Sequence, residues 1–148
     1  MEVRVQKDDF DTAAEVHRLT ADEPQVGAVV TFRGIVRDSN LDDPLSAMEL
    51  EQYSGMTLKA IEKIAAEAER RWSILGGLIV HRYGRLETGE NIVLVVVVAT
   101  HRKTAFEAAS FLIDWLKTKA PFWKKEIRAS GEHWIKARVD DDHAADRW

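Results

Sequence analysis

Stretches in which hydrophobic and polar residues alternate are interspersed with stretches in which apolar residues recur every three or four positions. Alternation or a β-rich composition predicts strands, and these cover residues 2–7, 26–37, 46–53, 77–83, 91–100, 124–129 and 133–139. Helical spacing predicts helices, and these cover residues 11–19, 56–72 and 100–119. Strands and helices do not alternate strictly, so the pattern favours an α+β fold in one domain spanning residues 1–148.

Details of the pattern predict how the elements are connected. The run Ile92–Ala99 is apolar on both faces, which places it centrally in a sheet. Gly76 and Gly77 are expected to break the chain after the second helix, and GRLETGE (84–90) to join two paired strands. Ser130-Gly131-Glu132 predicts the turn of a hairpin, and the last residues, DDDHAADRW, are expected at the surface.

The composition excludes several classes of chemistry. The chain has no cysteine, which rules out disulfides, thiolate metal sites and a cysteine nucleophile. It carries no P-loop and no dinucleotide fingerprint, and its five histidines lack zinc-ligand spacing. Asp140-Asp141-Asp142-His143 is better explained as a solvated acidic tail than as a metal cluster. We therefore expect no metal and no cofactor.

The termini and apolar runs indicate where the chain resides. The first ten residues lack the apolar core of a signal peptide, and the longest apolar run is too short to cross a bilayer. The expected location is the cytoplasm, away from the membrane.

Charge is unevenly distributed along the chain. The net charge is −4, which argues against a nucleic-acid binder. Residues 101–125 nevertheless contain six basic and two acidic residues, so this segment is net +4 and the rest of the chain −8. A positive patch on an acidic protein suggests a small anionic ligand or the acidic tail of a partner.

The start of the third helix combines Thr100 with three bases, His101, Arg102 and Lys103. A helix N-terminus offers free N–H groups and partial positive charge, so these residues predict a phosphate site. A purely structural explanation of this helix start is equally well supported: Thr104 and Glu107 fit a capping box, and the three basic side chains are solvated.

At the other end of this helix, Lys117 falls on the stripe of Phe106, Ser110 and Ile113, whereas Lys119 should face solvent. Lys117 either keeps its ammonium in water, which geometry alone favours, or lies in a pocket and transfers protons. Pro121-Phe122-Trp123 follows and can wall a cavity.

Beyond this turn, Lys124 can return near Lys117. Arg37 ends a glycine-bent strand before the polar loop 38–44. Each of these residues has an ordinary structural explanation when taken alone, and only their combination suggests a site.

Five segments, in order, make the chain resemble the large, catalytic subunit family of molybdopterin synthase, of MoaE type. They are GAVVTFRGIVR (27–37), MELEQYSGM (48–56), HRYGRLETGE (81–90), THRKTAFEAASFLIDWLKTKAPFWKKE (100–126) and GEHWIKAR (131–138). The resemblance covers nearly the whole chain, and its fourth block is long and specific. Gln52 and Ser54 depart from the His and Pro common in the family, which affects only a local turn.

The resemblance implies an α/β-hammerhead fold, with a mixed or antiparallel sheet on which two main helices pack. It also implies a homodimer that binds a small ubiquitin-like subunit at each end, forming a heterotetramer. The C-terminal Gly-Gly of that partner carries a thiocarboxylate, which agrees with the missing cysteine. The implied activity is sulfurtransferase: sulfur passes to cyclic pyranopterin monophosphate, and the dithiolene of molybdopterin forms for molybdenum cofactor biosynthesis.

The resemblance also assigns roles by position. Lys117 would be catalytic, as an acid–base group or a stabiliser of the anion formed, with support from Lys124. The positions implied for substrate binding are Ile35, Val36, Arg37, His101, Arg102, Lys125 and Glu126, with Arg138 a weaker candidate. Arg37, His101 and Arg102 would hold the phosphate and pterin, some from the second protomer. The loop 38–44 is expected to be mobile and to close over the site.

Three alternatives remain from other classes. The first is a non-catalytic phosphate-ligand binding module of the same fold, which would not need Lys117 at its position. The second is a phosphoester hydrolase with His101 as base, for which no carboxylate or metal partner is suitably spaced. The third is a fused or moonlighting interaction protein, for which this length leaves no extra domain.

Overall fold

The computed structural model describes residues 1–38, 41–135 and 139–148, and it contains strands and helices in mixed order. In chain order the elements are β1 (Glu2–Gln6), α1 (Thr12–Thr20), β2 (Ala28–Ile35), β3 (Leu45–Gln52), α2 (Met56–Arg71), β4 (Ile74–Arg82), β5 (Gly84–Glu87), β6 (Asn91–Ala99), α3 (Arg102–Thr118), β7 (Phe122–Arg128), β8 (Gly131–Ile135) and α4 (Val139–Ala145). The α+β class predicted from the pattern is confirmed.

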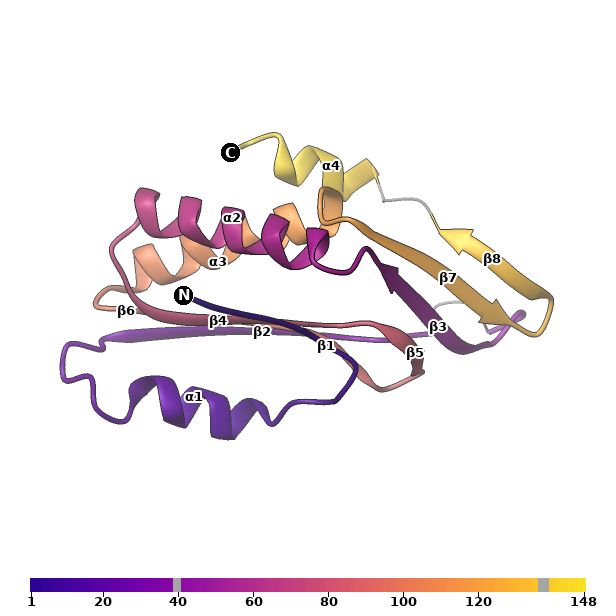
Figure 1. Cartoon of the computed structure of the whole chain (residues 1–148), viewed down its shortest axis with the longest axis horizontal. Coiled ribbons are helices and arrows are strands. Elements are labelled where there is room, and N and C mark those ends of the chain that lie inside the picture. The colour runs from indigo at the N-terminus through magenta and orange to yellow at the C-terminus, as the bar shows by residue number, and fades with distance from the viewer. Residues whose placement is uncertain (39–40, 136–138) are drawn as a thin grey trace.

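The first sheet has the strand order β1-β4-β6-β2 and forms the middle layer of the molecule. β1 pairs with β4 in parallel, whereas β4 and β2 pair antiparallel with β6. Helices α2 and α3 cover one face and α1 covers the other (Figure 1). β6 lies between β4 and β2 and is buried on both faces. Its continuous apolar sequence predicted this central position.

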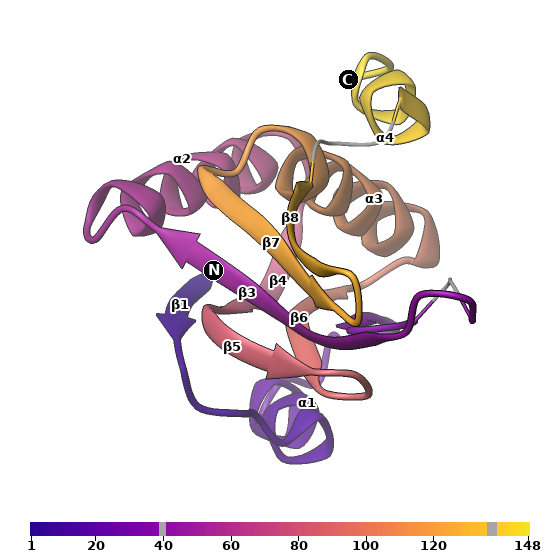
Figure 2. The ribbon, with the colours of Figure 1, turned by 90° about the vertical axis from the view of Figure 1, so that its right-hand side faces the viewer.

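The second sheet has the order β5-β3-β7-β8, and every neighbouring pair is antiparallel. Figure 2 shows its strands in front of the first sheet, with β3 and β7 crossing the end of that layer. Its inner side buries Leu45, Leu50 and Leu86 together with Val36, which follows β2. The chain thus forms two sheets rather than the single sheet expected, joined where β2 and β4 end and β6 begins.

The main core lies between the first sheet and helices α2 and α3. Alternate residues of β4 and β6, such as Ile79 and Val95, pack against Ile61 of α2 and Leu112 of α3. The intervening residues, such as Val80 and Val96, face the other layer, where α1 covers them. Both faces of the sheet are therefore apolar, which explains why β4 and β6 lack polar alternation.

Several connections differ from the prediction. Gly76 and Gly77 do not break the chain but lie inside β4, which begins at Ile74. The segment 84–90 is more than a connection, because its first half forms β5 of the second sheet. The C-terminal tail includes α4, and the Trp148 ring packs edge-on against Trp72 and Phe111. The hairpin of β7 and β8 is confirmed.

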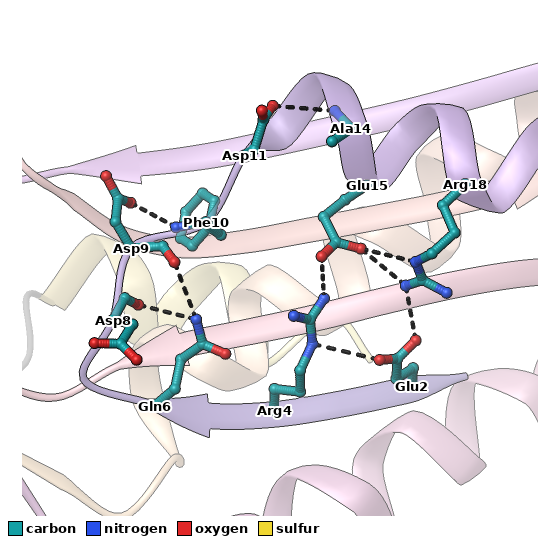
Figure 3. A network of polar contacts seen from close by, with 10 residues as sticks. All are labelled: Glu2, Arg4, Gln6, Asp8, Asp9, Phe10, Asp11, Ala14, Glu15 and Arg18. Atoms are coloured by element: carbon teal, nitrogen blue, oxygen red, sulfur yellow. Dashed lines mark hydrogen bonds and ion pairs between the residues drawn. The ribbon is translucent and has the colours of Figure 1, made fainter.

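Helix α1 is attached to the edge of the first sheet by a polar network (Figure 3). Its N-cap is Asp11, whose carboxylate accepts a hydrogen bond from the Ala14 backbone N–H at 3.0 Å. Glu15 accepts hydrogen bonds from both Arg4 of β1 and Arg18 of the same helix. Arg18 also donates to Glu2 at 2.8 Å, so two acids and two bases join helix and strand.

None of the helices in the described ranges is both long enough and apolar enough to span a lipid bilayer.

Candidate active site

A pocket of about 60 Å³ opens where the last turn of α3 meets the ends of β2 and β4 and the starts of β6 and β7. Its lining residues are Phe32, Gly34, Ile35, His81, Ile92, Val93, Ile113, Leu116, Lys117 and Lys124. The walls are largely apolar, and the polar side chains among these residues are two lysines and one histidine. Lys117 and Lys124, predicted to approach each other across the turn, do line one pocket.

Lys117 lies on the flank of α3 rather than on its core-facing side. The buried residues of the helix include Ala105, Ala108 and Leu112. Phe106 lies on the same stripe of the helix as Lys117 and is 60% exposed, so this stripe does not face the core. Near the end of the helix, Ile113 and Lys117 on this stripe line the pocket. The lysine is exposed overall while lining the cavity. This geometry matches a lysine whose stem follows apolar surface and whose ammonium reaches water.

Strand β7 sends its two adjacent lysines to opposite sides, as strand geometry requires. Lys124 faces the pocket. Lys125 instead pairs with Glu49 at 3.6 Å and Glu132 at 3.4 Å, and its ammonium lies 5.4 Å from the Trp134 ring centre. A hydrogen bond to Glu132 raises the pKa of Lys125, and the smaller effect of burial, which lowers the pKa, does not cancel this rise. Lys125 therefore stabilises the second sheet and does not line the pocket.

Glu126 is also engaged within the second sheet. It forms an ion pair with Arg128, whose guanidinium is 3.5 Å from Asp38. Arg128 also donates to the backbone carbonyl of Asp43 at 2.7 Å. These contacts anchor both ends of the loop 38–44, of which residues 39 and 40 lie outside the described residues. The expected mobility of that loop stays a prediction.

The three residues predicted at the end of β2 have different surroundings. Ile35 is 42% exposed and lines the pocket. Val36 is 1% exposed, and its backbone N–H and carbonyl already bond Glu90 and Gly89, so its side chain is not available to a ligand. Arg37 is exposed and is not among the lining residues. Arg138 lies outside the described residues.

His101 and Arg102 lie at the opposite end of α3 from Lys117. His101 is the N-cap, without a side-chain capping bond, and both residues are exposed. The predicted capping box is therefore wrong: Thr104 lies inside the helix, and Glu107 accepts a hydrogen bond from the Trp72 indole at 3.1 Å. A 17-residue helix is about 25 Å long. The basic helix start and the lysine pocket therefore do not form one site within a single chain.

The sequence prediction missed His81, which ends the apolar part of β4. It is 4% exposed, its ring stacks on Phe122 with centres 3.8 Å apart, and it lines the pocket. Burial lowers the pKa of His81 to about 4, the charges of Lys124 and Lys117 add to this, and hydrogen bonding to the Arg82 carbonyl opposes it. The available signal was a histidine closing the apolar run LIVH within a strand.

The chain matches a family model described as "MoaE protein" over residues 5–119. The molybdopterin synthase catalytic subunit of Mesorhizobium japonicum is 52% identical, covering 99% of this chain and 92% of that protein. The solved structure of the molybdopterin biosynthesis MoaE protein of Burkholderia ambifaria matches with a TM-score of 0.83 and 53% identity, covering 100% of this chain and 98% of that chain.

A more distant structure shares the fold. It comes from Helicobacter pylori and is described as a protein–protein complex of subunits 1 and 2 of molybdopterin-converting factor. The match has a TM-score of 0.72 at 24% identity, covering 92% of this chain and 91% of that chain. With the family model matching most of the chain and a relative identical at half of all positions, this chain belongs to the MoaE family, the family of molybdopterin synthase catalytic subunits.

Proposed function

We propose that this chain transfers sulfur from the C-terminal thiocarboxylate of a small ubiquitin-like subunit to cyclic pyranopterin monophosphate, in the cytoplasm. The observation that supports this most is the pocket, in which Lys117 and Lys124 meet over apolar walls. The chain contains no cysteine, so sulfur has to arrive on another molecule. A thiocarboxylate is an anion, and two ammonium groups at an apolar pocket provide its counter-charge.

The shape of the pocket suits the end of an extended peptide. The pocket has room for a chain terminus without bulky side chains, such as the Gly-Gly expected of the partner. The apolar side chains Phe32, Ile113 and Leu116 exclude water from such a tail. Capture of a terminal carboxylate-like group by basic residues is a recurrent mode of peptide recognition.

The proposed chemistry exchanges one sulfur for one oxygen in each of two transfers. The thiocarboxylate sulfur forms a carbon–sulfur bond on the precursor in place of a carbon–oxygen bond, whose oxygen leaves as water. Water then breaks the acyl–sulfur bond of the resulting thioester, and the tail leaves as a carboxylate without net oxidation or reduction. Negative charge develops on oxygen and sulfur during both steps. Lys117 and Lys124 stabilise that charge, and Lys117 also moves protons at the reacting atoms.

The phosphate of the precursor needs a second group of bases. His101 and Arg102 provide such a group, but they lie about 25 Å along α3 from Lys117. We propose that each complete site takes Lys117 and Lys124 from one chain and His101 and Arg102 from a second copy, with Arg37 contributing at the pocket rim. A homodimer thereby becomes a functional requirement. The complex with a small subunit has a parallel in the complex of subunits 1 and 2 described for Helicobacter pylori.

A single-turnover reaction tests this function. The chain is mixed with a thiocarboxylated small subunit and cyclic pyranopterin monophosphate, and dithiolene pterin is quantified after oxidation to its fluorescent form. Product is expected only with the thiocarboxylate. The matched control is the same small subunit ending in an ordinary carboxylate, which should give none.

Absence of product from a folded chain that binds the small subunit would refute the proposal. It would favour the non-catalytic binding module, and calorimetry with the precursor alone would then be the decisive measurement.

A further inference from the structure

The outer edge of β2 is poorly protected against pairing with another strand. β2 ends the first sheet beside β6, and no strand within the described ranges pairs with its other side. Proteins usually protect such an edge with charged residues or proline, or keep it short. β2 has eight residues, of which only Arg33 is charged. The opposite edge strand, β1, has five residues, two of them charged.

One flank of α3 lies above the edge of β2. This flank carries the stripe of Phe106, Ser110, Ile113 and Lys117, and its last two residues line the pocket together with side chains of β2. Phe106 is 60% exposed, and two apolar residues near the ends of β2, Val29 and Ile35, are 37% and 42% exposed. Exposed apolar side chains that gather along one edge are typical of an interaction surface.

Helix α3 and strand β2 run in the same direction and have similar lengths. At their starts, Gly27 lies against the Thr100 carbonyl, and at their ends Ile35 and Lys117 line the same pocket. Eight residues of strand and seventeen of helix each span about 25 Å. A two-fold axis through the middle of the edge therefore brings the start of α3 in one copy beside the lysine pocket of the other.

Strand pairing and helix packing fit the same two-fold axis. Paired strands lie about 4.8 Å apart, and α3 contacts both β2 and β6, so the helix lies slightly inward of the edge. The two α3 helices then come within about 10 Å of each other, the spacing at which helices pack. Ser110, at the middle of α3, is small enough to lie at the axis, where Phe106 of one copy meets Ile113 of the other.

Side-chain alternation leaves two central registers for the paired strands. Directly opposed residues share a face of the sheet, so either Thr31 or Phe32 faces its own counterpart. Arg33 then faces Val29 in the first register and Thr31 in the second. The two arginines face each other in neither register, so the pairing brings no repulsion between them.

We infer that two copies of this chain join through the outer edges of their β2 strands, which pair antiparallel while the flanks of α3 pack together. The inference rests on the proposed function, which takes His101 and Arg102 from a second copy, and it names the surface that brings them. The basic start of each α3 then lies about 10 Å from the lysine pocket of the other copy, which leaves room for a small phosphorylated substrate between them.

Single cysteines test the pairing directly, because the chain has none of its own. Opposed Cα atoms lie about 4.5–5.5 Å apart, within the range of a disulfide. Under mild oxidation, Thr31→Cys chains should crosslink with one another in the first register, or with Arg33→Cys chains in the second. Glu62→Cys, at an exposed position on α2, is the control and should stay uncrosslinked. Failure of both combinations would overturn the inference, whether the chain is then monomeric or joined through another surface.

A charge placed on α3 provides a second measurement. Phe106→Asp puts a carboxylate into the apolar contact, and the fold should survive because this side chain is already largely exposed. Sedimentation should show monomers, and the single-turnover rate should fall on the order of 100-fold while the small subunit still binds. Met56→Asp, at an apolar side chain 51% exposed on α2, is the matched control and should leave the dimer intact. A dimeric and fully active Phe106→Asp chain would contradict the inferred surface.

The crosslinking result separates this inference from the proposed function. Crosslinks through β2 in a chain that forms no dithiolene product would refute the function and leave the interface standing. Product formation by a chain that crosslinks in neither combination would refute the interface and leave the function standing.

Discussion

At the residue scale, Gly27 lies where no side chain fits. A Cβ built on it would come within 2.1 Å of the Thr100 carbonyl oxygen, a backbone atom that cannot move alone. Its own N–H donates to the Ala99 carbonyl at 3.1 Å, so the start of β2 is packed directly against the segment leading into α3. Gly76, in the same sheet, has open space at the equivalent point.

We expect Gly27→Ala to lower the free energy of unfolding by about 1–3 kcal/mol, as overpacking does. Gly76→Ala is the matched control, and it should leave stability close to wild type because nothing lies within 4 Å of the added Cβ. Urea denaturation of both variants provides the comparison. Equal stability of the two variants would show that the contact at Thr100 relaxes without cost.

Two of the residues singled out from the sequence, Lys117 and Lys124, do line one pocket. Lys117 stood out because it falls on the apolar stripe of its helix, and Lys124 because the turn after that helix can bring it back near Lys117. Val36 and Lys125 were included because they adjoin matched residues, and burial and strand alternation then separated them from the pocket. His81 was missed because a histidine in an apolar strand looks like an ordinary core residue until its neighbours are known.

At the element scale, α1 depends on charge as well as on apolar packing. Partial burial by itself raises the pKa of Glu15, but hydrogen bonds from Arg4 and Arg18 outweigh this and hold the pKa below its ordinary value. A carboxylate with a lowered folded-state pKa adds stability at neutral pH. That contribution declines as the pH falls below the unfolded value near 4.5 and is gone below the folded-state pKa.

Replacing Glu15 by Gln should therefore cost about 1 kcal/mol at pH 7. The difference from wild type should shrink as the pH falls below 4.5, where the wild-type carboxyl also becomes neutral. Glu62→Gln, an exposed position on α2, is the control and should have little effect at either pH. A Glu15→Gln penalty that persists undiminished at pH 3 would contradict the charge-based explanation.

Elements with strong periodicity were predicted well, and those defined by distant partners were not. Helices α2 and α3 and the central strand β6 carry their signals locally. Strand β5 is four residues long and forms only because β3 lies beside it, and the C-terminal segment is ordered partly by Trp148 packing on Trp72. The division into two sheets depends on strand pairing across the chain, which alternation alone does not specify.

At the scale of the whole molecule, the length of α3 separates the two groups of basic residues. The proposed site is complete only when two copies combine, which predicts complementation between variants. Mixed dimers of Lys117→Ala and Arg102→Ala chains, purified through two different tags, contain one site with both changes and one with neither. Such dimers should have about half the wild-type rate, because one of two symmetric sites is intact.

Both parental homodimers serve as controls and should be far less active than the mixed dimer. If the residues of a site all came from one chain, every site in the mixed dimer would carry one change. Activity no higher than that of the parents would therefore contradict a shared site.

The most direct measurement compares Lys117→Ala with Lys119→Ala in the single-turnover reaction with thiocarboxylated small subunit. Both residues are exposed lysines at the end of α3, but only Lys117 is among the lining residues of the pocket. We expect Lys117→Ala to slow dithiolene formation by about 100-fold or more while retaining the fold, and Lys119→Ala to react at close to the wild-type rate. Equal rates for the two variants would contradict the assignment of this pocket as the site of sulfur transfer.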